Sequence, residues 1–209
     1  FDRATSATGD EWSVDETAQR LIESGAIEPI IVVGIYNAGH RRIDEYTPTR
    51  DPRKRVGGKA DAYARMLVQE IKPFIDRRYR TLRSAANTGL GGSSLGGLLT
   101  LHLGLRFHTV FNRLAVLSPS VWWNDRAIVR EVDALTAKPP LRIWLDSGTA
   151  EGADVTRDAR LLRDALVRKG WLVGKDLAYL EAEGGGHNEQ SWATRVEGVL
   201  RFLFPLGQR

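Results

Sequence analysis

Residues 91–97 read Gly-Gly-Ser-Ser-Leu-Gly-Gly and separate a strand-like run from an apolar, helix-like run. Glycines here predict a sharp turn from strand to helix, because glycine adopts backbone conformations that other residues avoid. Ser94 has a glycine two residues before it and two residues after it, whereas Ser93 has Leu95 at the second offset. The Gly-x-Ser-x-Gly spacing therefore favours Ser94 as a nucleophile held on a strained turn.

The same pattern also occurs in ordinary glycine-rich loops, where serines cap the following helix. The strands and helices around the turn are needed to distinguish a nucleophile turn from an ordinary capping loop. If the turn holds a nucleophile, the amide of Leu95 lies in the first turn of the helix. An amide in that position stabilises negative charge on a substrate oxygen. Leu95 is therefore the expected oxyanion donor.

Strand-like and helix-like runs alternate along the whole chain. The run at 29–36 is continuously apolar and β-branched, as is typical of a strand buried on both faces. Alternation of this kind predicts a parallel sheet with helices on both sides and functional residues at the carboxyl ends of its strands. Strands are expected at 29–36, 87–92, 113–118, 141–147 and 176–182, and helices at 13–25 (opened by a Ser13–Glu16 capping box), 63–75 (bent near Pro73), 98–105, 126–135, 155–169 and 189–202.

Composition restricts the partners that the chain can have. We expect residues 1–209 to form one domain, and no stretch is apolar for long enough to cross a membrane. The absence of cysteine excludes disulfides, thiolate metal sites and cysteine nucleophiles. The net charge is only +4, and the densest basic group, residues 50–55, has no interleaved aromatics to stack bases. We therefore expect no nucleic-acid partner, no membrane partner, no metal and no cofactor.

A serine hydroxyl needs a positioned base that takes its proton. His187 follows three glycines in the loop between the last expected strand and the last expected helix. We therefore assign it as the base. The remaining histidines lie before the serine or close behind it, and we expect them to be structural or solvated. They are His40, His102 and His108.

The third group of such a site is a carboxylate that accepts a proton from the imidazole. The loop after strand 141–147 offers several acidic residues. Asp146 is expected to lie within the strand and to pin the loop, while Asp154 and Asp158 fit the first turn of the next helix. Glu151, at the loop tip between small residues, is the first choice and Asp154 the reserve.

Five segments in a fixed order resemble the family named "Putative esterase", α/β-hydrolases related to enterochelin esterases, feruloyl esterase domains and, more distantly, mycolyltransferases. They are IIVVGIYNAGHRRIDEYTP, GLGGSSLGG, LAVLSPSVWW, LDSGTAEG and GGGHNEQSW. The resemblance implies an α/β-hydrolase-type three-layer sandwich, with Ser94 as nucleophile, His187 as base and Glu151 as acid. Several relatives carry aspartate where this chain carries Glu151.

The resemblance also implies that strands are missing. Family members usually begin with several strands that precede the segment resembling Phe1 and Asp2. The last of these strands lies between those expected here at 29–36 and 87–92, and its loop supplies the second oxyanion donor. The comparison therefore implies an N-terminally incomplete domain, in which a missing N-terminal segment or a second chain completes the sheet.

By this resemblance the chain hydrolyses a small carboxylic ester (siderophore, hydroxycinnamoyl or sugar) through an acyl-enzyme. Acyl transfer at the same triad and a catalytically silent binding module are the alternatives.

Side chains near the strand ends are candidates for contact with the substrate. Trp122 and Trp123 follow strand 113–118, with core packing as the alternative. Tyr36, Asn37 and Arg41 end or follow strand 29–36. Solvation is the alternative for the arginine.

Overall fold

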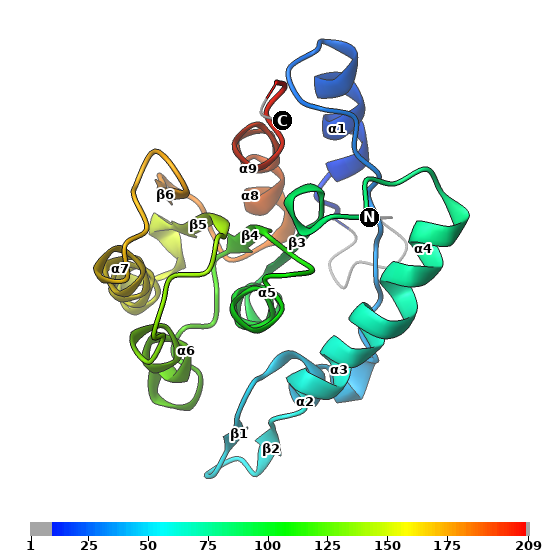
Figure 1. The fold of residues 1–209 in the computed structure, drawn as a ribbon. Coiled ribbons are helices and arrows are strands. Elements are labelled where there is room, and N and C mark those ends of the chain that lie inside the picture. The colour runs from blue at the N-terminus through cyan, green and yellow to red at the C-terminus, as the bar shows by residue number, and fades with distance from the viewer. Residues whose placement is uncertain (1–9, 208–209) are drawn as a thin grey trace.

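A four-stranded parallel sheet forms the centre of the molecule (Figure 1). The computed structural model describes residues 10–207. The strands are β3 (Gly89–Ser93), β4 (Arg113–Leu117), β5 (Arg142–Gly148) and β6 (Leu177–Ala182), in the spatial order β3-β4-β5-β6. All three neighbouring pairs are parallel, so the carboxyl ends of the strands meet at one edge. These four strands confirm the α/β prediction.

Helices cover both faces of this sheet. In Figure 1, α5, α6 and α7 lie on one side, and α8 and α9 lie on the other. Alternate residues of β4 explain this arrangement, because Leu114 and Val116 pack in the larger core with α5 whereas Ala115 and Leu117 pack with α9. The helices of these layers are α5 (Leu95–Arg106), α6 (Trp123–Asp133), α7 (Ala153–Arg168), α8 (Glu189–Ala193) and α9 (Val196–Leu203).

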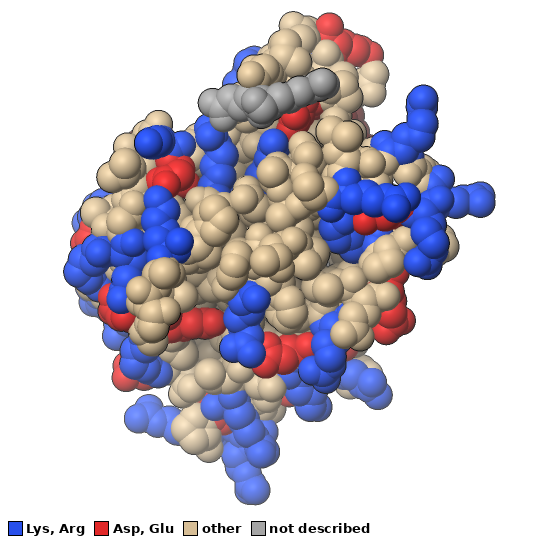
Figure 2. Space-filling model, in the orientation of Figure 1, with Lys and Arg blue, Asp and Glu red and all other residues tan. Residues whose placement is uncertain are grey.

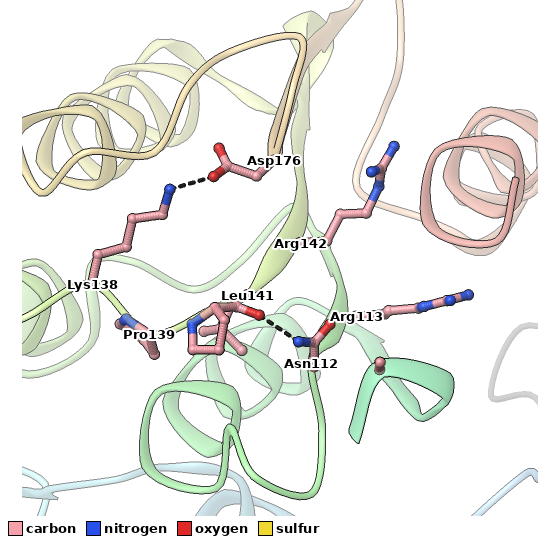
Figure 3. Close-up of a pocket in the computed structure, with 9 residues that line it drawn as sticks. Asn112, Arg113, Lys138, Pro139, Leu141, Arg142 and Asp176 are labelled. Carbon is pink, nitrogen blue, oxygen red and sulfur yellow. Dashed lines mark hydrogen bonds and ion pairs between the residues drawn. The ribbon is translucent and has the colours of Figure 1, made fainter. Parts of the chain in front are cut away.

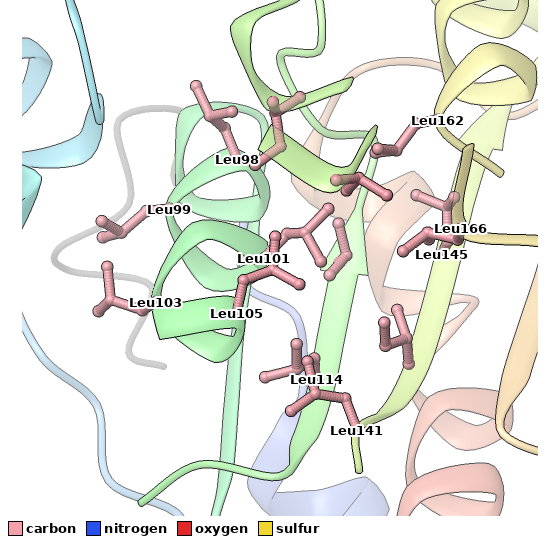
Figure 4. Close-up of a cluster of buried hydrophobic side chains, with 14 of the residues drawn as sticks. Leu98, Leu99, Leu101, Leu103, Leu105, Leu114, Leu141, Leu145, Leu162 and Leu166 are labelled. Atoms are coloured by element: carbon pink, nitrogen blue, oxygen red, sulfur yellow. The ribbon is translucent and has the colours of Figure 1, made fainter. Parts of the chain in front are cut away.

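The α5 helix is apolar on every side. All of its residues from Leu95 to Leu105 are buried. A helix with this pattern has to be enclosed completely. Leucines of α5 pack against those of β4, β5 and α7 (Figure 4). This packing fixes the helix that follows Ser94.

Most of the remaining elements precede β3 in the chain, and η5 connects β5 to α7. They are α1 (Val14–Glu23), η2 (Gly39–Arg41), α2 (Arg42–Tyr46), the hairpin β1 (Arg50–Asp51) and β2 (Val56–Gly57), α3 (Ala60–Met66), η3 (Leu67–Ile71), α4 (Lys72–Arg78), η4 (Ala85–Asn87) and η5 (Thr149–Glu151).

The prediction of a strand at 29–36 is wrong. These residues form no strand, and Ile31, Val32 and Tyr36 expose 51%, 40% and 72% of their surface. Figure 1 shows the segment as a blue coil between α1 and α2. An extended segment becomes a strand only when a neighbour pairs its backbone groups, and among residues 10–207 β3 pairs only with β4. A groove of about 660 Å³, lined by residues of the segment and of β3, lies where such a neighbour would be.

One local prediction needs correction, and the helix predicted at 63–75 is confirmed. Ser13 has φ 49° and makes no side-chain cap hydrogen bond, so α1 forms without the predicted capping box. The helix predicted at 63–75 runs through α3, η3 and α4, with a π-turn at η3 just before Pro73. Proline cannot donate a backbone hydrogen bond, and the wide turn accommodates it.

The charged residues are spread over the surface. Lysines and arginines surround the face shown in Figure 2, with acidic side chains among them. No helix of residues 10–207 has the length and apolar content that a bilayer crossing requires.

Candidate active site

Ser94 lies on the sharp turn between β3 and α5. Its backbone has φ 57° and ψ −123°, a strained conformation for a residue with a side chain. The amide of Ser94 donates to the Leu117 carbonyl at 3.1 Å, and its carbonyl accepts from the Ser120 amide at 3.0 Å. These two bonds tie the turn to the end of β4. The turn that the glycine spacing predicts is therefore present.

The two glycines of the Gly-x-Ser-x-Gly motif have different roles. A Cβ at Gly92 would lie 2.8 Å from the backbone of Gly96, whereas a Cβ at Gly96 would meet only the Tyr46 ring at 3.8 Å. Gly92 is therefore required by close backbone packing. Gly96 leaves room for a methyl group.

This difference gives a matched pair of variants. We expect Gly92→Ala to destabilise the protein by about 1–3 kcal/mol, because the backbone has to move apart. We expect Gly96→Ala to be neutral or to stabilise α5 by up to about 1 kcal/mol, because alanine favours helix. Urea unfolding of both variants measures these changes. Equal loss of stability in the two would contradict this account of the turn.

Leu95 is the first residue of α5, so its amide lies ahead of the first helical turn and has no carbonyl there to bond. The first hydrogen bond into this turn comes from Leu98, which donates to the Ser94 carbonyl at 3.1 Å. An amide in this position can donate to an anion, and the role of Leu95 as oxyanion donor stays a prediction.

The hydroxyl of Ser94 pairs with a second serine. Its Oγ lies 3.3 Å from the Oγ of Ser120, a buried residue that follows β4. Within residues 10–207 this is its one side-chain hydrogen bond, and no bond joins it to His187. Sequence analysis did not single out Ser120, although it stands in the quoted LAVLSPSVWW segment.

His187 and Glu151 form a close pair at the carboxyl edge of the sheet. The imidazole Nδ1 lies 2.7 Å from Glu151 Oε2. The imidazole is 41% exposed, while the Glu151 side chain is fully buried. The ring also stands edge-on to Trp192, with the centroids 5.1 Å apart. An accessible imidazole fixed from below by a carboxylate is the arrangement that a general base requires.

Glu151 is held as a carboxylate. Its Oε1 accepts from the Ser118 hydroxyl at 2.5 Å and from the Gly148 amide at 2.8 Å. Burial raises the pKa of Glu151, but the hydrogen bonds from His187, Ser118 and Gly148 outweigh it and hold the pKa below its usual value. The reserve candidate Asp154 is instead 83% exposed and pairs with Arg157 on α7 at 2.8 Å. The geometry therefore favours Glu151.

A buried polar cluster lies beneath this pair. Asp146 lies within β5, as expected, but it holds the end of β4 rather than the loop after β5, since its Oδ1 accepts from the Ser118 amide at 3.0 Å. Arg195, which precedes α9, donates to the same Oδ1 at 2.6 Å. Sequence analysis missed Ser118, Trp192 and Arg195 as site residues, because their contacts depend on the tertiary fold.

The two adjacent tryptophans differ in environment. Trp122 is 48% exposed and carries the Lys54 ammonium above its ring at 5.1 Å. Trp123 is 2% exposed and donates to the Thr49 carbonyl at 2.9 Å. Only Trp122 is therefore presented to solvent near Ser120, and Trp123 follows the core-packing alternative.

The other predicted contact residues belong to the coil between α1 and α2 and to η2, and Asn37 lines the same groove as Ser93 and Gly96. Tyr36, Asn37 and Arg41 are exposed. In the described part of the chain no hydrogen bond or ring contact joins them to Ser94 or His187. Asn37 accepts from the Gly39 amide at 2.9 Å and stabilises its own turn. Their assignment to the substrate stays a prediction.

Of the other histidines, His102 is the most enclosed. It is 5% exposed, with Nδ1 2.8 Å from Glu131 and Nε2 3.4 Å from Asp61. These contacts confirm a structural role. Among residues 10–207 no group of three or more histidine, aspartate and glutamate side chains is placed to hold a metal ion.

A second cavity, of about 540 Å³, opens at the amino ends of β4 and β5 (Figure 3). Its cationic side chains already have partners. Lys138 pairs with Asp176, Arg113 pairs with Glu28, and Arg142 donates to the Phe202 carbonyl at 2.6 Å. This cavity lies at the sheet edge opposite Ser94.

Solved structures share this fold. A BES protein from Bacillus cereus superposes with a TM-score of 0.71 at 22% identity, covering 93% of this chain and 77% of that chain. The enterobactin esterase FES from Shigella flexneri superposes with a TM-score of 0.70 at 20% identity, covering 91% of this chain and 50% of the other.

Curated sequences show the same relationship. The uncharacterized protein YbbA of Bacillus subtilis is 23% identical over 202 residues, which are 90% of this chain and 79% of that protein. The ferri-bacillibactin esterase BesA of the same organism is 27% identical over 190 residues, covering 80% of this chain and 65% of BesA. The family model described as "Putative esterase" matches residues 4–203. The chain therefore belongs to this esterase family and has its α/β-hydrolase-type fold.

Proposed function

We propose that the protein is a serine carboxylic ester hydrolase that works through an acyl-enzyme. One observation carries this proposal: Ser94 on its strained turn and the 2.7 Å His187–Glu151 pair occupy the same edge of the sheet. Ser94 is the nucleophile, His187 the base and Glu151 the acid that orients it. Membership of the esterase family supports the reaction type.

The first half-reaction follows from these contacts. The Ser94 hydroxyl turns from Ser120 toward His187 Nε2, which takes its proton as Oγ attacks the ester carbonyl carbon. Catalytic hydrogen bonds are often open before substrate binds, so the contact with Ser120 is compatible with this step. Glu151 stabilises the imidazolium, and the Leu95 amide donates to the oxyanion. Collapse of the tetrahedral intermediate breaks the ester C–O bond, and His187 protonates the departing alcohol.

The second half-reaction repeats these roles with water. His187 takes a proton from water, the resulting oxygen nucleophile attacks the acyl carbon, and Ser94 leaves with the proton returned to it. Acyl transfer would differ only in that an alcohol replaces the water. Relatives named as siderophore esterases support a siderophore ester as the substrate.

We also propose that a polypeptide segment outside residues 10–207 fills the groove beside β3 as an additional strand. The unpaired edge of β3 and the exposed apolar segment opposite it support this proposal. The BES protein, of which this chain covers 77%, contains additional chain that can provide such a strand. The incoming strand would carry the second oxyanion donor, and the loss of one donor typically costs about 10²–10³-fold in rate.

Hydrogen exchange tests this completion of the sheet. The amides of β3 on its open side are expected to exchange fast in the 209-residue chain and to become protected when a longer polypeptide supplies the strand. Turnover should rise by about 10²–10³-fold in the same comparison. Protection that appears only on dimerisation would instead identify a second copy as the occupant, and protection in the monomeric chain would contradict the proposal.

A panel of chromogenic esters with acyl groups of increasing size tests the reaction itself. We expect hydrolysis of at least one small ester, together with stoichiometric labelling of the protein by a fluorophosphonate. A folded chain that completes its sheet, yet neither hydrolyses an ester nor takes the label, would be a binding module, and the proposed reaction would be wrong.

A further inference from the structure

A cluster of buried polar side chains supports Glu151 from below. It consists of Ser118, Asp146, Trp192 and Arg195, and we call it the Arg195 cluster. The exposed fractions are 0% for Ser118 and Asp146, 4% for Arg195 and 5% for Trp192. The four residues come from the end of β4, from β5, from α8 and from the residue before α9. A polar cluster buried this deeply is costly unless its groups are paired.

The guanidinium of Arg195 lies between two buried carboxylates. Its Nη1 donates to Asp146 Oδ1 at 2.6 Å, and its Nε donates to the Ser191 carbonyl at 3.0 Å. Its Nη2 has no hydrogen-bond partner but lies 3.6 Å from Glu151 Oε1. The two carboxylates therefore lie against one shared cation.

The shared cation affects the ionisation of Glu151, the proposed acid. Two buried carboxylates without a cation would repel each other, and one of them would take up a proton. Burial raises the pKa of Asp146 above its usual value and the Glu151 charge adds to the rise, while Arg195 opposes it. The contacts of Asp146 are with donors, namely Arg195 Nη1, the Ser118 amide and Trp144 Nε1, and the Arg195 charge favours the ionised form of both carboxylates. An ionised Glu151 is what stabilises the imidazolium of His187.

Ser118 connects the cluster to Glu151 through its hydroxyl. Its oxygen accepts from Trp192 Nε1 at 3.0 Å and from Arg195 Nη1 at 3.3 Å. Because both neighbours can only donate, the proton of the hydroxyl is directed to Glu151 Oε1, at 2.5 Å. Ser118 is held for this contact at φ 41°, a strained value that its surroundings must impose.

We propose that Arg195 is a positioning residue for the reaction. Through its charge and through Asp146 and Ser118, it keeps Glu151 ionised and aimed at His187. The inference rests on the proposed function, because it concerns the acid of that triad. It adds Arg195 to the residues that the reaction needs, beside Ser94, His187 and Glu151.

A double-mutant cycle tests this role in the full chain. Arg195→Met should lower kcat by about 10²-fold with little change in KM, because a displaced acid misorients the base. Arg195→Lys, which retains the charge, should recover part of the loss. In a Glu151→Gln background, Arg195→Met should change kcat less than about twofold, because the two residues act as one unit.

Arg113→Met is the matched control. Arg113 is also a buried arginine paired with a glutamate, but it begins β4 at the opposite edge of the sheet. Its loss should lower the urea midpoint and leave kcat unchanged. If Arg195→Met prevents folding, Ser118→Ala removes the hydroxyl that donates to Glu151 and keeps the Arg195–Asp146 pair. It should lower kcat about tenfold in the wild-type background and not in the Glu151→Gln background.

The outcomes separate the two proposals. A wild-type chain that hydrolyses esters, with additive effects of Arg195→Met and Glu151→Gln, would overturn the role of Arg195 alone. The same holds if Arg195→Met loses activity only in proportion to its unfolded fraction. A folded wild-type chain that neither turns over esters nor labels with a fluorophosphonate would overturn the proposed function, and the role of Arg195 with it.

Discussion

Ser94→Ala is expected to lower kcat by about 10⁴-fold or more on every ester that the wild-type protein hydrolyses. The hydroxyl is the attacking atom in the proposed reaction, and no other group at the turn can replace it. The change should leave the fold intact, since it removes one oxygen whose partner is the Ser120 hydroxyl. Steady-state turnover and intact-mass detection of a fluorophosphonate adduct measure the effect.

Ser93→Ala is the control for this variant. Ser93 is the last residue of β3 and lies directly before the nucleophile. It should label and turn over like wild type. A fluorophosphonate adduct that persists in Ser94→Ala and disappears in Ser93→Ala would show that Ser93, and not Ser94, is the nucleophile.

His187→Ala is expected to lower kcat by about 10⁴-fold and to slow fluorophosphonate labelling, because no base then takes the Ser94 proton. The imidazole is 41% exposed, so water and added imidazole can enter the vacated space. Partial recovery of turnover with added imidazole is therefore part of the expected result. Initial rates with and without imidazole provide the measurement.

The stability of this variant should change only at the level of one hydrogen bond. The bond from His187 helps to hold the pKa of Glu151 below its usual value. Ionised Glu151 therefore contributes stability at neutral pH that is lost as the pH falls through its folded-state pKa, and His187→Ala reduces this contribution. His108→Ala, at a histidine whose Nδ1 lies 3.4 Å from the Leu105 carbonyl, is the control that should keep full activity. Turnover near the wild-type level in His187→Ala would show that another group is the base.

Local sequence patterns were sufficient for the sheet and for the nucleophile turn. The central strands β4 and β5 are mostly buried and the edge strand β6 is partly buried, and each contains an apolar run that local sequence reveals. The turn at Ser94 depends on backbone contact between Gly92 and Gly96, which are close in sequence. Both kinds of information are contained in short segments.

Predictions failed where a distant partner decides the outcome. Segment 29–36 has the composition of a buried strand, but no neighbour pairs it in residues 10–207. The hairpin of β1 and β2 was missed because each strand has two residues and the loop between them is charged. Arg195 and Ser118 are ordinary polar residues in sequence, and only the fold brings them to Glu151. The roles of Ser94, His187, Glu151 and Leu95, and the single-domain assignment, stay predictions.

The unpaired side of β3 also affects the behaviour of the chain at high concentration. Backbone groups on an open strand can bond to any extended segment that reaches them, including the same strand of another molecule. The exposed side chains Ile31, Val32 and Val33 lie opposite this edge and would gain burial in such a contact. A net charge of +4 provides only weak repulsion against it. Preparations of this chain should therefore form oligomers, and in time precipitate, unless dilution or a bound strand protects β3.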